Sequence, residues 1–295
     1  MQDWLQANLV SLLNGIALGV LLYVLAVGLS VMLGMLNMLN LAHGTLYLLG
    51  AYAAYTVVGP GAGLMTFGLA LLLAIVVGAV AGTALELMAR PLEGKGHMDE
   101  ALLTLGIALA GGVLLSSVFG ADIHSIPPPS ELGSSVTIAG QPYPLYRLAL
   151  IVAGLLVAMG VEYVLERTTT GALIRAIVHD REQVSVLGVN VRYVMLGVFA
   201  ASSALALVAG VLGGPILGAA PGLDGQVLLL AMVVVVIGGL GSSRGALIAA
   251  LVVGVVQNLG TAISTPLAPF LIFGTMVAVL ALRPNGLMGR AAVGR

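Results

Sequence analysis

Three polar residues recur at regular spacing inside an apolar stretch near the N-terminus. Asn37, Asn40 and His43 lie three residues apart within residues 36–44. On a helix this spacing places the three side chains on one stripe. In hydrocarbon such side chains need hydrogen-bonding partners, so we expect the stripe to face the interior of a helix bundle or a watery path. Two roles stay open: lining a translocation path, or holding neighbouring helices together by hydrogen bonds.

A second pattern is rich in glycine and covers residues 239–245. Gly239, Gly241 and Gly245 follow a run of β-branched residues in a near miss to a dinucleotide-binding fingerprint. Another apolar run follows at once, and no acidic residue lies about 20 positions further on to hold a ribose hydroxyl. We therefore expect a break in a membrane helix where glycine lets the backbone turn, with a pure packing role as the alternative.

The chain carries none of the common catalytic or metal-binding patterns. It has no cysteine, no P-loop, no H-E-x-x-H motif and no G-x-S-x-G motif. His43 has no second metal ligand three or four residues on, so neither a metal site nor a catalytic site is expected. No carboxylate or lysine lies at the middle of an expected span, where a proton-coupled carrier needs one. If the protein drives transport, we expect the energy to enter through a partner.

The elements that must position these residues are membrane helices. Of the 295 residues, 60% are hydrophobic and 8% are charged, and the mean hydropathy is +1.13. A soluble domain cannot bury so much apolar surface, and the net charge of −1 gives no basic footprint for nucleic acid. The apolar runs predict an all-α, polytopic protein with eight or nine transmembrane helices. They cover residues 9–33, 36–58, 64–89, 101–119, 147–165, 193–213, 227–238, 245–260 and 267–282. The two short runs, 227–238 and 245–260, are either two spans or one broken, re-entrant element.

The basic residues predict the orientation in the membrane. If residues 90–99, 166–192, 239–244 and the tail after Leu282 are cytoplasmic, every one of the 11 basic residues except Arg147 lies inside. The N-terminus is then expected outside and the C-terminus inside. Glycine pairs four apart, such as Gly15/Gly19 and Gly78/Gly82, predict close helix packing. Glu86 and Arg90, also four apart, predict an ion pair.

Two long connections join the helices. The outer one, 120–146, contains three prolines and then a β-rich stretch, so we expect an extended segment and a short hairpin. The inner one, 166–192, is rich in charge and is expected to form a helix with Ile174, Ile177 and Val178 on one face. Its mixed charges differ from those of a basic lipid-surface helix. We expect it to lie in the groove of a partner and to transmit force.

Five stretches between residues 40 and 287 carry a family resemblance. They are Asn40–Gly44 with Leu49–Tyr52; Arg90–Leu92; Thr170–Gly171, Arg175–Ala176, Asp180 and Leu187–Val189; Gly238–Ser242 with Gly245–Ala246; and Arg283–Leu287. Through them the sequence resembles the LivH family of permease subunits from branched-chain amino acid ABC transporters. The resemblance implies a type II-like ABC importer permease in a bacterial plasma membrane, with residues 1–295 as one transmembrane domain.

The resemblance also implies partners and site residues. A related second permease subunit, two ATPases and a substrate-binding protein on the outer face are expected, with ATP and magnesium held by the ATPases and no cofactor in this chain. The expected ATPase-docking residues are Thr170, Gly171, Ile174, Arg175, Ile177, Val178, Asp180, Arg181, Leu187 and Gly188. The expected path residues are Asn37, Asn40, His43, Gly239 and Gly241.

The expected solute is a branched-chain or other hydrophobic amino acid. Urea, short amides or a sugar is the alternative within transport. A passive channel is less favoured, because it needs no docking loop. An intramembrane enzyme would need a nucleophile and base or a metal-ligand pattern, and none is found.

Overall fold

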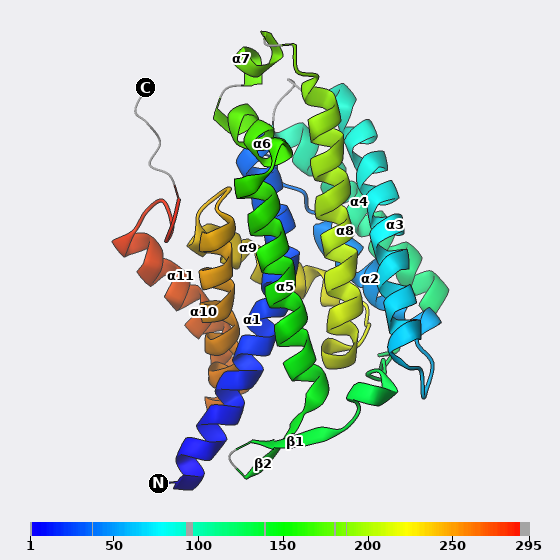
Figure 1. Cartoon of the computed structure of the whole chain (residues 1–295), viewed down its shortest axis with the longest axis vertical. Helices are drawn as coiled ribbons and strands as arrows, with labels where there is room; N and C mark the ends of the chain where they lie inside the picture. The colour runs from blue at the N-terminus through cyan, green and yellow to red at the C-terminus, as the bar shows by residue number, and fades with distance from the viewer. Residues whose placement is uncertain are drawn as a thin grey trace.

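A computed structural model describes residues 2–289 except 37, 93–96, 139, 180 and 187. The chain is a bundle of helices with one small hairpin (Figure 1). The helices are α1 (Gln2–Leu36), α2 (His43–Val57), α3 (Leu64–Ala89), α4 (His97–Phe119), α5 (Leu145–Arg167), α6 (Thr169–His179), α7 (Arg181–Val186), α8 (Val191–Leu217), α9 (Leu223–Gly238), α10 (Ser243–Ile263) and α11 (Ala268–Leu282). Short 3₁₀ turns cover Arg90–Leu92, Ser130–Leu132 and Thr265–Leu267, and the strands are β1 (Ser135–Ile138) and β2 (Gln141–Pro144).

Seven helices in the described part of the chain are long and apolar enough to cross a membrane: Leu9–Gly34, Leu64–Leu92, Met98–Phe119, Leu145–Arg167, Val191–Leu217, Ser243–Ile263 and Thr265–Leu282. Helices α2 and α9 have 15 and 16 residues. At 1.5 Å per residue each covers only about 22–24 Å, less than the ~30 Å of hydrocarbon. The polytopic helical architecture is confirmed, and the predicted eight or nine spans correspond to the seven long helices with these two short ones.

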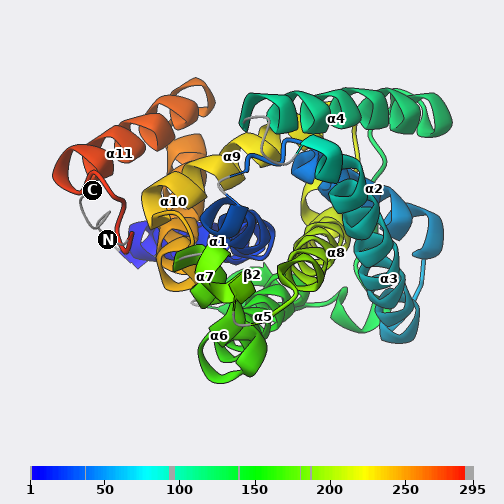
Figure 2. The ribbon, with the colours of Figure 1, turned by 90° about the horizontal axis from the view of Figure 1, so that it is seen from above.

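Helix α1 forms the centre of the bundle. In an apolar 18-residue stretch of α1, 78% of the residues are buried, whereas in the corresponding stretch of α4 only 6% are. The view along the long axis shows α5, α8, α9 and α10 around α1 (Figure 2). The closest approach is to α10, where a Cβ on Gly19 would lie 2.7 Å from Ala250 O and one on Gly254 would lie 2.4 Å from Gly15 O. Glycine is required because a side chain would push the two backbones apart.

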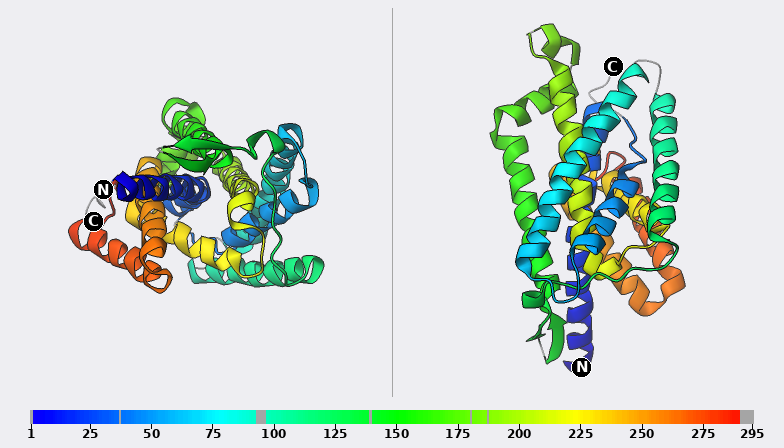
Figure 3. Two further views of the ribbon diagram at one scale, coloured as in Figure 1. Left: turned by 90° about the horizontal axis from the view of Figure 1, so that it is seen from below. Right: turned by 90° about the vertical axis from the view of Figure 1, so that its right-hand side faces the viewer.

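The two long connections lie at opposite ends of the bundle. The hairpin and the start of α1 are at one end, and α6 and α7 are at the other (Figure 3). The hairpin expected in 120–146 is confirmed, with Val136 opposite Tyr143 and Ile138 opposite Gln141. The same connection caps α3, because Leu64 N donates a 2.9 Å hydrogen bond to Glu131 Oε2. The predicted ion pair is also present: Arg90 Nη2 lies 3.0 Å from Glu86 Oε2.

The continuous helix expected over residues 36–58 is wrong. The chain leaves the helical conformation after Leu36 and resumes it at His43, with residues 38–40 irregular and 41–42 in a turn. Asn37, Asn40 and His43 therefore do not share one helical stripe, and Asn37 lies outside the described residues. No proline or charged residue marks this break in the sequence. Contacts with α4 and α1 stabilise it instead.

Candidate functional site

Asn40 and His43 are buried at the break between α1 and α2. Asn40 Oδ1 accepts a 3.1 Å hydrogen bond from Ala42 N, which fixes the turn before α2. His43 Nε2 donates to Leu25 O of α1 at 3.0 Å. Both side chains are 0% exposed, and neither lines the two cavities described below. Their contacts are those of interhelical hydrogen bonding, the alternative to lining a path.

The break is also tied to α4. Thr104 Oγ1 donates to Leu39 O at 3.1 Å and accepts from Leu41 N at 3.2 Å. One hydroxyl thus satisfies two backbone groups that lack a helical partner, as buried backbone requires. Because Thr104 lies in the first third of α4, the chain between α1 and α2 runs within the bundle, and α2 starts inside it.

The glycine-rich turn between α9 and α10 packs against the segment after α11. Gly239 and Gly241 have φ angles of +93° and +74°, so the expected break at glycine is confirmed. A Cβ on Gly239 would lie 2.4 Å from Gly289 N. Leu287 N donates to Ile237 O at 2.8 Å, and Met288 N donates to Gly238 O at 3.1 Å. Two of the stretches that carry the family resemblance are therefore in direct contact.

The start of α10 joins this turn to α5. Ser242 Oγ accepts a 3.0 Å hydrogen bond from Gly245 N and caps the helix. The Arg244 side chain approaches Glu162 Oε1 of α5 to 2.5 Å. A cavity of about 330 Å³ lies beside this pair, and Arg175 of α6 lines it with Glu166 and Gly241. The turn and the helical connection therefore meet at one end of the bundle.

Helix α6 lies across the end of α5. Gly171 N donates to Thr168 Oγ1 at 3.1 Å, so Thr168 caps the start of the helix. A Cβ on Gly171 would lie 2.2 Å from Val164 O, so only glycine permits this crossing. The helix α7 that follows ends before Gly188, whose φ is +80°.

The apolar face of α6 is buried in its own chain. Ile174 is 8% exposed and belongs to the main core. Ile177 is 3% exposed and packs in a small cluster with Val184, Val191 and Met195. The expectation that these isoleucines fill a partner's groove is thereby corrected. Because α6 lies against the bundle, its apolar face packs on the helices of its own chain.

The outward face of α6 carries small and polar side chains. Thr169, Thr170, Ala172 and Ala176 are exposed, and Arg175 is half-buried. Asp180 and Leu187 lie outside the described residues, as do the side chains of Val178 and Arg181, although Arg181 is in α7. A partner at this end of the described structure would meet this outward face.

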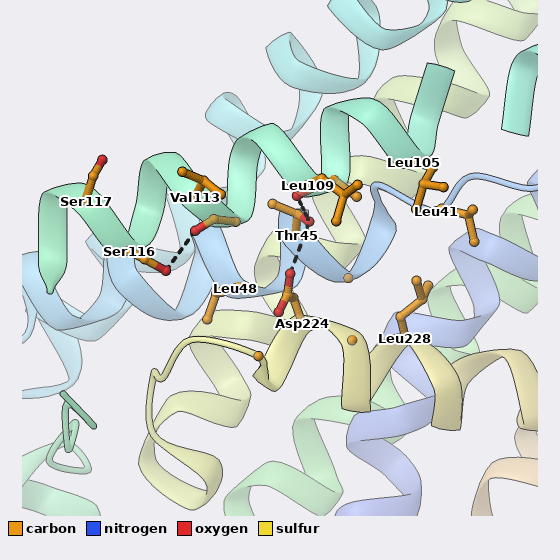
Figure 4. Close-up of a pocket in the computed structure, with 15 residues that line it drawn as sticks. Leu41, Thr45, Leu48, Leu105, Leu109, Val113, Ser116, Ser117, Asp224 and Leu228 are labelled. Atoms are coloured by element: carbon orange, nitrogen blue, oxygen red, sulfur yellow. Dashed lines mark hydrogen bonds between the residues drawn. The ribbon is translucent and has the colours of Figure 1, made fainter. Parts of the chain in front are cut away.

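A larger cavity, of about 640 Å³, lies between α2, α4 and the start of α9 (Figure 4). Asp224, in the first turn of α9, faces it. Thr45 Oγ1 lies 3.4 Å from Asp224 Oδ2 and donates to Ala108 O at 3.3 Å. Ala108 is the central residue of α4, so this carboxylate is at about half the depth of a long span.

Asp224 was not predicted, and the expectation that no carboxylate lies at the middle of a span is wrong. The seventh predicted apolar run begins at Val227, three residues after Asp224. Two signals were available: Asp224 is the only acidic residue after Glu182, and Pro221-Gly222 before it marks a turn, after which an acidic residue suits the first turn of a helix. Its depth follows from tertiary packing, because α9 begins beside the centre of α4.

Two helices begin at this depth. A Cβ on Gly44 of α2 would lie 2.3 Å from Asp224 O, so the first turns of α2 and α9 are in contact. The first N–H groups of any helix have no acceptor within it. Both N-termini therefore place partial positive charge beside the cavity. Among the residues that the structure describes, no three His, Asp or Glu side chains gather to hold a metal ion.

Comparisons with known proteins agree along almost the whole chain. The sequence model of one family, described as branched-chain amino acid transport system / permease component, matches residues 11–280. The chain is 29% identical to the high-affinity branched-chain amino acid transport system permease protein BraD of Pseudomonas aeruginosa, over 96% of each chain. It is 27% identical to the corresponding protein LivH of Salmonella typhimurium and 26% identical to LivH of Escherichia coli K12, over 95% of each chain. No solved structure gives a significant match.

Proposed function

The chain belongs to the family of permease components of branched-chain amino acid transport systems, and on this premise we propose that it is the membrane-spanning subunit of an ATP-driven importer of branched-chain or other hydrophobic amino acids. The observation that carries the proposal is the family match over residues 11–280, in a chain whose described residues form seven long apolar helices. Residues 1–295 would form one transmembrane permease domain. The curated relatives are permease proteins of high-affinity systems for the same solutes.

The energy for transport would come from other subunits. The sequence has no P-loop, so we propose that two ATPase subunits bind ATP and magnesium and that this chain is not itself an enzyme. A second, related permease subunit would complete the membrane part. A substrate-binding protein would deliver the solute at the end that carries the hairpin. The charge pattern supports an outer N-terminus and a cytoplasmic C-terminus in a bacterial plasma membrane.

The ATPase would dock on α6 and α7. Thr170 and Gly171, Arg175, and the residues up to Gly188 remain the proposed contact segment, with Ile174 and Ile177 now assigned to anchoring it. The outward side chains of Thr170, Ala172 and Ala176 would meet the partner directly. Small side chains on a helix let another backbone approach closely, which suits a tight dock.

Movement of this segment would reach three parts of the bundle. Gly171 contacts the end of α5, Ile174 packs into the core around α1, and Ile177 packs against Val191 and Met195 of α8. Packed elements respond to force as units. A push on α6 would therefore shift α1, α5 and α8 together, and α1 would carry the shift to α10 through their close backbone contact.

Uptake by the assembled complex tests the proposed function. The chain is purified with its co-encoded subunits, reconstituted into vesicles with ATP inside and the binding protein outside, and given radiolabelled L-leucine, urea or ribose. We expect uptake of leucine that depends on ATP and on the binding protein. Leucine uptake that persists without ATP would identify a passive channel, and transport of urea or ribose alone would replace the proposed solute.

The docking face is tested by a bulky substitution. Ala176→Trp should weaken binding of the ATPase roughly 5- to 150-fold and so reduce its co-purification, because a misplaced large side chain at a packed interface costs about 1–3 kcal/mol. Ala121→Trp, on an exposed residue of the outer connection, is the matched control and should leave the complex intact. Full retention of the ATPase by Ala176→Trp would place the dock elsewhere.

A further inference from the structure

We propose that the cavity between α2, α4 and α9 is a solute-binding site halfway through the membrane, where Asp224 binds the ammonium group of a hydrophobic amino acid. The inference rests on the proposed function and adds to it a binding site within this chain. Three properties of the cavity carry it: an unpaired carboxylate, two helix N-termini, and an apolar wall.

Among the residues that the structure describes, no cation pairs with the carboxylate of Asp224. Its Oδ2 accepts a hydrogen bond from the hydroxyl of Thr45 at 3.4 Å, and the ion pairs between described residues are those of Arg90 with Glu86 and Arg244 with Glu162. An ionisable group at the middle of a membrane is costly unless it pairs or faces a watery cavity, and such groups mark substrate pathways. Asp224 is half-buried and faces a cavity large enough for a solute.

The helix N-termini supply the opposite charge. Asp224 and Gly225 are in the first turn of α9, and Gly44 and Thr45 are in the first turn of α2. Residues from both first turns line the cavity. N–H groups at the ends of short helices at mid-depth suit an anionic group of a transported solute. In an amino acid, the ammonium and carboxylate groups are attached to the same carbon atom. The carboxylate can therefore bind these N–H groups while the ammonium group binds Asp224.

Most of the remaining wall of the cavity is aliphatic, although Ser116 and Ser117 of α4 also line it. The aliphatic part is formed by Leu41, Leu48, Leu105, Leu109, Val113 and Leu228. Figure 4 shows Leu109 and Val113 on α4 and Leu228 on α9 on either side of the polar pair of Thr45 and Asp224. The volume of about 640 Å³ is within the range of small-molecule sites. An apolar wall beside a small number of charges selects a solute with an aliphatic side chain and a charged backbone.

The test compares Asp224→Asn with Asp122→Asn in the complete reconstituted complex. Asp122 is exposed in the outer connection, after the end of α4, and does not line the cavity, so it controls for the loss of one carboxylate. Asp224→Asn keeps the shape and removes the charge, and we expect leucine uptake to fall roughly 10- to 100-fold. ATP hydrolysis stimulated by leucine-loaded binding protein should stay within about twofold of wild type, because docking and solute delivery do not involve Asp224.

Leucine uptake by Asp224→Asn within twofold of wild type would overturn the inference while leaving the proposed function intact. Absence of leucine uptake by the wild-type complex would overturn the proposed function, and the inference with it. Reduced uptake by both variants would show a general effect of charge removal and would also count against the site.

A second measurement does not depend on the stability of Asp224→Asn. Ser116→Cys places a single thiol at the cavity of this cysteine-free chain, and its modification by N-ethylmaleimide is followed during turnover. We expect leucine with its binding protein to slow the modification at least about threefold, since occupancy of the cavity blocks access. Leucine should not protect a cysteine at Ser134, in the exposed loop before the hairpin. Equal rates at Ser116→Cys with and without leucine would overturn the inference.

Discussion

Gly241 is the residue whose conformation most directly fixes the turn between α9 and α10. Its φ of +74° is one that β-branched residues avoid, and its Cα lies against Gly34 at the end of α1. Gly241→Val should therefore destabilise the protein by about 1–3 kcal/mol and lower uptake. Gly106→Val is the control, because a Cβ on Gly106 meets no atom within 4 Å. The readouts are thermal unfolding in detergent and leucine uptake, and normal values for both would show that the glycine is incidental.

Asn40 gives a prediction of the opposite kind, in which stability changes and transport does not. Asn40→Leu leaves the buried Ala42 N–H without an acceptor, at a cost of about 1–3 kcal/mol. The melting temperature of the purified protein should fall, while uptake per assembled complex stays near wild type. Gln257→Leu, at a half-buried position on α10, is the control, because within the described structure only the backbone carbonyl of Gln257 accepts a hydrogen bond, from Thr261. Lost uptake at unchanged stability would return Asn40 to the translocation path.

The sequence was sufficient to predict the residues whose conformation or contacts depend only on near neighbours in the chain. The Glu86–Arg90 pair follows from spacing on one helix, and the turn at Gly239 and Gly241 follows from the conformational freedom of glycine. Asp224 was missed because neither its neighbours nor its spacing fixes its depth. That depth is set by Thr45 of α2, which contacts both Asp224 of α9 and Ala108 of α4, although all three are far apart in the chain.

At the scale of elements, one small cluster holds the end of α6 and the helix α7 to α8. Ile177→Asp places a charge among Val184, Val191 and Met195, so the segment should detach from α8. Hydrogen exchange measured by mass spectrometry should accelerate at least about tenfold in residues 169–186, while α1 and α10 keep their protection. Ala176→Asp, on the exposed face of the same helix, should leave the exchange unchanged. Unchanged exchange in Ile177→Asp would mean that other contacts anchor the segment.

Element types were predictable, and so was the break marked by glycine between α9 and α10, but the break between α1 and α2 was not. The helices, the hairpin and the amphipathic connection follow from hydrophobic period and turn residues. The break between α1 and α2 has no such signal, because Thr104 of α4 satisfies the backbone of Leu39 and Leu41 from another helix. Asn40 then fixes the turn through Ala42 N. The amphipathic pattern likewise identified the apolar face of α6, but it could not show what covers that face. The helices of the same chain cover it.

At the scale of the whole molecule, the charge pattern and the fold agree on two distinct ends. Residues 239–244 and the segment after α11 are in contact, and Arg244 joins them to the end of α5 beside α6. Segments that the positive-inside rule assigns to the cytoplasm therefore gather at one end, although the rule uses no structure. The outer connection 120–146 lies at the other end, with the hairpin (Figure 1).

This separation makes the orientation in the membrane testable with two single cysteines. Ser134, next to the hairpin, and Ser185, on α7, are both exposed and lie at opposite ends of the bundle. The concentration of basic residues at the end that carries α7 predicts that this end is retained in the cytoplasm. A membrane-impermeant thiol reagent added to intact spheroplasts should therefore label Ser134→Cys and reach Ser185→Cys only after the membrane is opened. Labelling of both positions from one side would contradict the spanning arrangement itself, and a reversed pattern would invert the protein, moving the proposed ATPase dock to the outer surface, where no ATP could drive it.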